Sequence, residues 1–155
     1  TGRTHHRTPN IITSLELDPA EMEKRNIHLQ KKYAEIEENE VRFEELHCED
    51  AEYLIVAFGS CARIAQKAME IAREEGIKVG LLRPITLWPF PSKAIAARAA
   101  QVKGILTVEL NAGQMVEDVR LAVECKVPVE HFGRLGGIVP DPDEVITALK
   151  EKLIK

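Results

Sequence analysis

The feature that most constrains this chain is a short apolar run that stops at a tight turn and is followed at once by an amphipathic stretch. Ile105–Leu110 has the length and the β-branched content of a strand, and an Asn-Ala-Gly turn at 111–113 ends it. A helical period follows, with Met115, Val119 and Ala122 on one side. Asn and Gly suit a turn with left-handed backbone. The stretch therefore predicts a strand, a turn and a helix.

The same pattern recurs along the chain. Tyr53–Phe58 is continuously apolar and ends in Gly-Ser-Cys at 59–61, and the amphipathic helix that follows stops at Gly76. Ile77–Leu82 and Val127–Phe132 have the composition of further strands. Continuously apolar strands are typical of sheets that helices cover on both faces. The alternation of strand and helix predicts an α/β fold, a three-layer α/β/α sandwich with a mainly parallel sheet.

The N-terminal third has a different character. Thr1–Leu17 has no clear period, and we expect an extended segment there. Asp-Pro-Ala-Glu at 18–21 combines an acidic N-cap, a proline at the first helical position and a Glu three residues on, so a helix to about Asn39 is predicted. Its apolar seam is narrow and consists of Met22, Leu29, Tyr33 and Ile36. Such a helix either packs on a neighbouring domain or subunit or stays a solvated arm, and both interpretations remain open.

A possible edge strand at Val41–Leu46 precedes the regular pattern. We therefore divide the chain into an N-terminal segment with a connecting helix over residues 1–50 and an α/β domain over residues 51–155. Because the chain starts at Thr1 rather than Met, we expect it to be a fragment or a processed product.

The connection after the second predicted strand is rich in proline. Arg83–Pro91 holds three prolines together with Trp88 and Phe90. Proline fixes φ and removes a backbone donor, so we expect a stiff loop that holds both aromatic rings in place. A helix should follow from Ser92 to about Val102. Later in the chain, a glycine-rich loop at 133–137 precedes a second acidic helix start at Asp141.

Composition excludes several classes of partner. The formal net charge of -4 and a pI near 5.8 argue against a nucleic-acid or anionic-membrane surface. No run of about 18 apolar residues exists, so no span of a bilayer is expected. Cys48, Cys61 and Cys125 are widely spaced and odd in number, which favours a reducing cytoplasm over a disulfide framework or a metal site. Two adjacent histidines, His5 and His6, point to opposite faces of an extended chain and do not predict a metal site.

Two loops are candidate ligand sites. Gly59 and Ser60 lie at a strand end against a helix start, where free N–H groups attract anions, and the loop around Gly136 has the flexibility to surround a phosphate. Neither a GxGxxG fingerprint nor a P-loop is present. Cys61 at the same helix start is either a reactive thiol or, with better support, a small apolar residue facing the sheet. No complete set of catalytic groups can be assembled from the sequence.

Three motifs in order give the chain a family resemblance. Gly59-Ser60 follows an apolar strand, Leu-Arg-Pro-Ile-Thr-Leu-Trp-Pro-Phe-Pro covers 82–91, and Val-Glu-Leu-Asn-Ala-Gly-Gln-Met covers 108–115. Together they closely resemble the C-terminal part of the α subunit of 2-oxoacid:ferredoxin oxidoreductases. The resemblance covers nearly the whole chain and leans toward the 2-oxoisovalerate type.

The resemblance implies a module similar to the transketolase C-terminal domain. Enzymes of that family oxidatively decarboxylate a 2-oxoacid on thiamine pyrophosphate, reduce ferredoxin through iron–sulfur clusters and transfer the acyl group to coenzyme A. In the parent complex the pyrophosphate, the Mg²⁺ ion and the clusters reside in other parts, so this fragment is expected to bind no cofactor and to hold no catalytic residue. Its implied partners are the pyrimidine-binding domain and the thiamine-binding subunit.

The leading hypothesis is therefore a structural domain at a subunit interface, inactive alone. The residues expected to shape that interface are loop residues at strand ends, namely Gly59, Ser60, Trp88, Phe90, Asn111, Gly113, Gln114 and Gly136. Two alternatives stay open. One is a free-standing anion- or nucleotide-binding protein that uses Ser60 and the loop around Gly136, and the other is the equivalent domain of a transketolase or a 2-oxoacid dehydrogenase.

Overall fold

The computed structural model describes Thr8, Ile11 and residues 15–154. The chain divides into two compact units, residues 1–35 and residues 36–155. Most of the predicted extended segment, including the His5–His6 pair, lies outside the described residues.

The main feature of the first unit is the helix α1 (Pro19–Asn39), whose last turn continues into the second unit. The helix begins where the sequence predicts, because the Asp18 carboxylate accepts the backbone N–H groups of Ala20 at 2.8 Å and Glu21 at 3.2 Å. No residue of α1 is buried. Its side chains are exposed except for Met22, Leu29 and Ile36, which are partly buried.

The second unit contains a five-stranded sheet with the order β1-β3-β2-β4-β5. The elements are β1 (Phe43–Leu46), β2 (Tyr53–Ala57), α2 (Gly59–Glu74), β3 (Val79–Pro84), α3 (Ser92–Ala99), β4 (Gly104–Glu109), α4 (Met115–Val123), β5 (Val129–Gly133), α5 (Pro142–Leu149) and a π-helical turn, η1 (Lys150–Ile154). Strands β2 to β5 are parallel, with Val56 of β2 opposite Thr107 of β4. Among the described strands, the edge strand β1 runs antiparallel to its neighbour β3, which follows it in the chain after β2 and α2.

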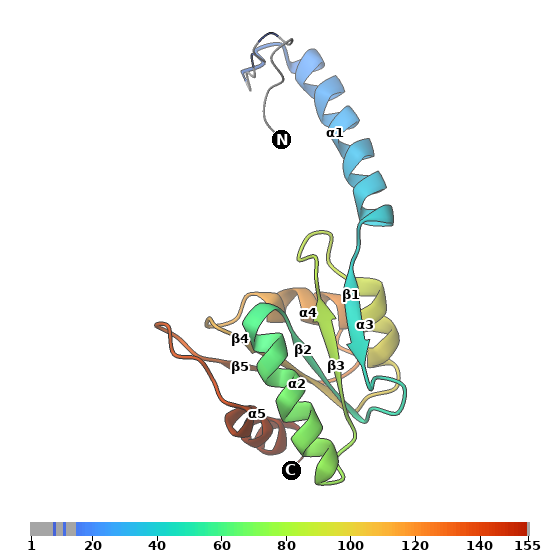
Figure 1. Cartoon of the computed structure of the whole chain (residues 1–155). Coiled ribbons are helices and arrows are strands. Elements are labelled where there is room, and N and C mark those ends of the chain that lie inside the picture. Colours follow the sequence, from blue (N-terminus) through green and yellow to red (C-terminus); the bar gives the residue numbers. More distant parts are fainter. Residues whose placement is uncertain (1–7, 9–10, 12–14, 155) are drawn as a thin grey trace. The chain divides into compact units, whose positions relative to one another are not determined.

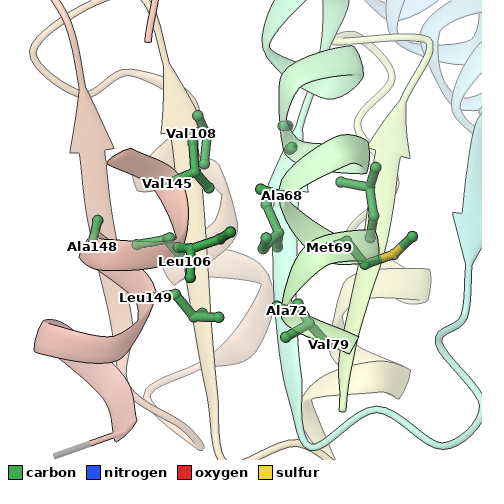
Figure 2. Packing of buried hydrophobic residues seen from close by; sticks show 14 of the residues in the cluster. Ala68, Met69, Ala72, Val79, Leu106, Val108, Val145, Ala148 and Leu149 are labelled. Carbon is green, nitrogen blue, oxygen red and sulfur yellow. The ribbon is translucent and has the colours of Figure 1, made fainter. Parts of the chain in front are cut away.

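Helices cover both faces of the sheet, as Figure 1 shows, and the three-layer α/β/α prediction is confirmed. On one face, α2 and α5 pack on β4 and β3, where Met69, Leu106 and Leu149 are almost fully buried (Figure 2). On the other face, α3 and α4 enclose a second core around Leu54, Ile95 and other buried side chains. Burial on both faces explains why the strands are continuously apolar.

Among the predicted boundaries that differ from the structure, two lie between β3 and β4. Strand β3 extends past Leu82 through Arg83 and Pro84, because β1 pairs with it there and Phe43 lies opposite Pro84. The stiff loop therefore begins at Ile85 rather than at Arg83. Helix α3 ends at Ala99, earlier than the predicted end near Val102. The extension of β3 arises from its pairing with β1, a segment distant in sequence that local patterns do not reveal.

Candidate functional site

The loops that follow the parallel strands meet at one edge of the sheet, which we call the carboxyl edge. It consists of residues 58–61 after β2, 85–91 after β3, 110–114 after β4 and 134–140 after β5. All the residues singled out in the sequence lie in these loops or at the first turns of the helices that follow. Open parallel sheets present their binding groups at this edge.

Glu109 organises the centre of the carboxyl edge. It ends β4, its side chain is fully buried, and its carboxylate accepts three backbone N–H groups at the start of α4. The distances are 3.2 Å from Gln114 N, 2.8 Å from Met115 N and 3.0 Å from Val116 N. A carboxylate at this position satisfies donors that no helical carbonyl can reach and complements the positive end of the helix. The buried strand thus fixes the direction of α4.

The predicted Asn-Ala-Gly turn is present between β4 and α4. The Asn111 side chain accepts the Gly113 N–H group at 2.7 Å, and Gly113 has a φ of 114°, a left-handed backbone that favours glycine. Gln114 precedes α4 with an exposed side chain, whose amide oxygen lies 3.5 Å from Asn111 Nδ2. The turn is therefore a rigid feature that leaves Gln114 directed to the surface.

His131 of β5 joins this turn to the sheet. Its Nδ1 lies 3.4 Å from Glu109 Oε1 and 3.2 Å from Thr107 Oγ1, and its Nε2 lies 3.2 Å from the Asn111 carbonyl oxygen. Next to it, a Cβ on Gly133 would approach that same carbonyl oxygen to 2.1 Å, so only glycine fits. The residues Thr107, Glu109, Asn111 and His131 form a connected polar network, which we call the Glu109 network.

Sequence reasoning missed the Glu109 network. The signal was present, because Glu109 is a charged residue inside an otherwise apolar strand, and a buried charge requires partners. His131 carried no comparable signal. It meets Glu109 only through the parallel pairing of β4 with β5, in which Thr107 lies opposite His131.

The proline-rich loop 85–91 is tied to the chain near residue 42. Ile85 N and Thr86 N donate to the Arg42 carbonyl oxygen at 2.9 and 3.1 Å, and the Thr86 hydroxyl donates to the Pro89 carbonyl oxygen at 2.9 Å. The two aromatic residues differ, since Phe90 packs against the second core while Trp88 is 54% exposed. The loop thus places an indole ring on the surface of the carboxyl edge.

The start of α2 and the glycine-rich loop lie apart from each other. Gly59 has a φ of 58°, Ser60 is exposed, and Gly136 has a φ of 66° in open space. Strand β4 stands between β2 and β5 in the sheet, so these loops follow strands that are not neighbours. Cys61 is buried, and burial raises the pKa of its thiol, which agrees with the apolar reading of that residue.

Exposed large apolar side chains of the second unit gather at the carboxyl edge. Among the described residues of the second unit, Leu121 is an exception, because it lies on α4 and is 77% exposed. The others form a set that we call the apolar rim: Phe43, Ile85, Leu87, Trp88, Leu110, Leu135, Ile138 and Val139. Phe43 belongs to it because antiparallel β1 starts beside the end of β3. An apolar set of this size at one edge is typical of a protein–protein interface.

The opposite, amino edge is polar. There the loop between β1 and β2 is held by Arg73 of α2, which pairs with Asp50 and donates to the His47 carbonyl oxygen at 3.0 Å. From the other face, Gln101 Nε2 donates to the Cys48 carbonyl oxygen at 2.6 Å. Lys103 pairs with Glu52 next to this loop. The ion pairs at this edge contrast with the apolar rim.

Two kinds of feature are absent from the described residues. No group of three or more His, Cys, Asp or Glu side chains within them is arranged to hold a metal ion. No helix among them has the length and the apolar character needed to cross a membrane.

The chain is similar to curated subunits of archaeal oxidoreductases. It is 49% identical over 142 residues, 92% of this chain, to the ketoisovalerate oxidoreductase subunit VorB of Methanothermobacter thermautotrophicus. The identity to the VorB subunit of Methanothermobacter marburgensis is 46% over the same share of the chain. In both comparisons the match covers only 40% of the relative, so the chain spans about two fifths of their length.

Two solved structures have a similar fold. A 2-oxoglutarate:ferredoxin oxidoreductase from Magnetococcus marinus matches 88% of this chain and 24% of its own, with a TM-score of 0.75 and 25% identity. A split-gene transketolase matches 73% of this chain and 41% of its own with a TM-score of 0.62 and 20% identity, a likeness of fold alone. The family model described as pyruvate:ferredoxin oxidoreductase core domain II matches residues 51–145. The chain therefore belongs to the 2-oxoacid:ferredoxin oxidoreductase family, as a member of its core domain II.

Proposed function

We propose that this chain is the C-terminal interface domain of the α subunit of a thiamine-pyrophosphate-dependent 2-oxoacid:ferredoxin oxidoreductase. The complex oxidatively decarboxylates a 2-oxoacid, with 2-oxoisovalerate as the proposed substrate, to an acyl-CoA and reduces ferredoxin. The substrate proposal is supported by the relatives named ketoisovalerate oxidoreductase subunit VorB. We also propose a cytoplasmic location, in which Cys48, Cys61 and Cys125 remain reduced.

The observation that carries this proposal is the apolar rim. A domain that works alone covers its large apolar side chains, whereas this domain leaves Trp88, Leu110 and Leu135 about half exposed at one edge. The Glu109 network, which lies at the end of β4 on the same edge, holds the central turn rigidly. A rigid apolar surface binds with little loss of conformational entropy, so it suits a permanent contact with another part of the complex.

The side chains that the structure describes do not fit the cofactors of the complex. Cys48 and Cys61 are buried in different layers, and Cys125 is exposed on a third segment, so they do not form a cluster-binding set. The Glu109 carboxylate already accepts three backbone N–H groups and is not available as a Mg²⁺ ligand. We therefore propose that thiamine pyrophosphate, Mg²⁺ and the iron–sulfur clusters are bound by other parts of the complex. In this proposal the domain positions the neighbouring parts of the complex and excludes water from the contact with them.

Each sequence candidate takes a role in the proposed interface. Trp88 supplies apolar area from the loop after β3, and Phe90 anchors that loop in the core. Asn111 and Gly113 hold the turn that presents Gln114. The exposed loops at Gly59, Ser60 and Gly136 lie at the same edge and are proposed to meet the pyrimidine-binding domain and the thiamine-binding subunit.

The test is co-expression with the pyrimidine-binding segment and the thiamine-binding subunit, read by pull-down and size-exclusion chromatography. Wild type should co-elute with both partners. The double variant Leu110→Ser, Leu135→Ser should lose at least about 10-fold in affinity, since each removes apolar contact area from the rim. The control is Leu121→Ser on α4, a leucine that is more exposed than Leu110 and Leu135 but lies outside the rim, and this variant should bind as wild type.

A wild-type chain that binds neither partner would refute the proposal. The alternative, anion or nucleotide binding at the start of α2, is favoured by one observation, the exposed Ser60 beside Gly59 in open space. Calorimetry of the chain with coenzyme A and with a nucleotide separates the two. Saturable binding that Gly59→Val abolishes would support the alternative.

A further inference from the structure

The ring of His131 has hydrogen-bond acceptors on both sides. Its Nε2 lies 3.2 Å from the Asn111 carbonyl oxygen, and its Nδ1 lies 3.4 Å from Glu109 Oε1. A carbonyl oxygen and an ionised carboxylate accept hydrogen bonds and donate none. A neutral imidazole has one N–H group, so one of its nitrogens would turn a lone pair toward an acceptor, whereas the imidazolium form donates on both sides.

The Thr107 hydroxyl does not remove this conflict. It lies 3.2 Å from His131 Nδ1 and 3.3 Å from the Glu130 carbonyl oxygen, and it has one proton to donate. When it donates to Nδ1, that unprotonated nitrogen stays beside the Glu109 carboxylate, and the Glu130 carbonyl loses its bond to the hydroxyl. When it donates to the Glu130 carbonyl, its oxygen can accept a hydrogen bond from a protonated Nδ1. The protonated ring therefore satisfies the whole Glu109 network.

Among the residues that the structure describes, Glu109 is the charged side chain in contact with His131. On β5, Glu130 projects to the opposite face of the sheet, because side chains alternate along a strand. Arg134, directly after β5, pairs with Glu144 of α5 at 2.9 Å. The residues of α4 that are buried against the sheet are apolar, and its charged residues are exposed: Glu117, Asp118 and Arg120. The proton on His131 is therefore the charge that balances buried Glu109.

The network exchanges protons with solvent through His131. Its side chain is 20% exposed, whereas that of Glu109 is fully buried. At the start of α2, burial and then the Glu109 charge raise the pKa of the Cys61 thiol, so this thiol stays neutral and adds no charge to the network. Imidazole is the side chain that titrates between about pH 5 and 8, so His131 makes the network sensitive to pH in that range.

We infer that His131 is a proton-dependent clamp on the central turn of the carboxyl edge, residues 111–114. With both ring nitrogens protonated it joins the Glu109 carboxylate to the Asn111 carbonyl oxygen, and when Nδ1 loses its proton the link to Glu109 is lost. This contribution to stability is complete at the acid end of the range and is lost as the pH rises through the titration of His131. The turn that presents Gln114 is therefore held more firmly at acidic than at alkaline pH. The clamp acts within the chain and does not depend on the partner that the carboxyl edge binds.

The test is NMR spectroscopy of the full chain between about pH 5 and 8. The ring nitrogens of His131 report its protonation. Hydrogen exchange of the Met115 and Val116 amides reports the order of the turn, because these amides donate to the buried carboxylate at 2.8 and 3.0 Å. We expect the protection of both amides, corrected for the intrinsic effect of pH on exchange, to fall by at least about 3-fold as the ring loses its proton. Both changes should have the same midpoint.

Two variants separate this clamp from other effects of pH. His131→Gln removes the titrating group and keeps an amide that donates hydrogen bonds, so protection in this variant should not change with pH. His28→Gln alters an exposed histidine of α1 and should keep the wild-type pH dependence. The wild-type titration is sufficient if the His131 variant does not fold. A ring whose protonation does not change over this range, amide protection that stays constant while the ring titrates, or a pH dependence that persists in His131→Gln would overturn the proposal.

Discussion

At the scale of single residues, the Glu109 carboxylate links strand β4, the start of helix α4 and strand β5. The carboxylate is enclosed between β4, the first turn of α4 and His131 of β5, and it is matched by three N–H donors. A buried charge with this many partners is stable only while the partners stay in place. The shape of the central turn at the carboxyl edge therefore depends on one side chain.

Replacing Glu109 with Gln should destabilise the domain by about 2–3 kcal/mol. The amide keeps the size but turns one acceptor into a donor that faces backbone N–H groups, which leaves buried donors unpaired. Chemical denaturation followed by circular dichroism measures the change. Glu117→Gln, at an exposed residue in the first turn of α4, is the control and should cost less than about 0.5 kcal/mol. Equal effects of the two variants would show that the network contributes nothing specific.

At the scale of elements, the edge strand β1 pairs with β3 in the sheet and is joined to helix α3 by one strong ion pair. Arg98 of α3 donates to both oxygens of Glu45 at 2.8 and 2.6 Å, and both side chains are only 22% exposed. Hydrogen bonding to the Arg98 guanidinium holds the pKa of Glu45 below its usual value of 4.5. The pair therefore couples β1 to the helix layer in a pH-dependent way.

The direction in which this ion pair changes the stability with pH follows from the lowered pKa of Glu45. Its contribution to stability is complete above the unfolded-state pKa near 4.5 and is lost as the pH falls through the lower folded-state value. We expect Arg98→Met to cost about 1 kcal/mol at pH 7 and to make the fall in stability below pH 4.5 shallower.

The pH dependence is measured by denaturation at a series of pH values, together with an NMR titration of the Glu45 carboxyl group in both proteins. The control is Arg83→Met, which removes the more exposed pair with Glu44 and should change the stability little. An unchanged Glu45 titration in the Arg98 variant would contradict the assignment.

At the scale of the whole molecule, burial is concentrated in one part of the chain. The buried residues among those described run from Cys48 to Leu149, and α1 has none. Yet β1, which precedes this range, contributes one edge of the sheet and the Glu45–Arg98 pair. The residue at which the stable domain begins therefore need not be residue 51, where the sequence places the boundary.

Truncation tests where the stable domain begins. A chain of residues 36–155 should keep the urea midpoint of the full chain, because it retains β1 and both cores. A chain of residues 51–155 loses β1 and buried Cys48 and exposes the edge of β3, so its midpoint should fall or the chain should aggregate. Equal midpoints for the two chains would show that β1 is dispensable and would support a boundary at 51.

The sequence by itself determined the layers and the turns of this protein. Its apolar runs and helical periods predicted the parallel strands and the helices that cover them, since both signals are local in the chain. The Asn111 turn and the Asp18 and Asp141 helix starts were equally predictable, because each side chain bonds a backbone group within three residues.

The tertiary structure alone decided what lies next to what. The contact of Glu109 with His131, the extension of β3 along β1 and the gathering of exposed apolar residues at one edge all join segments far apart in sequence. Hydrophobic periodicity reports which face of an element is buried, but it does not report against which element it is buried. The order of the strands decides which elements are neighbours, and therefore where the apolar rim and the proposed interface lie.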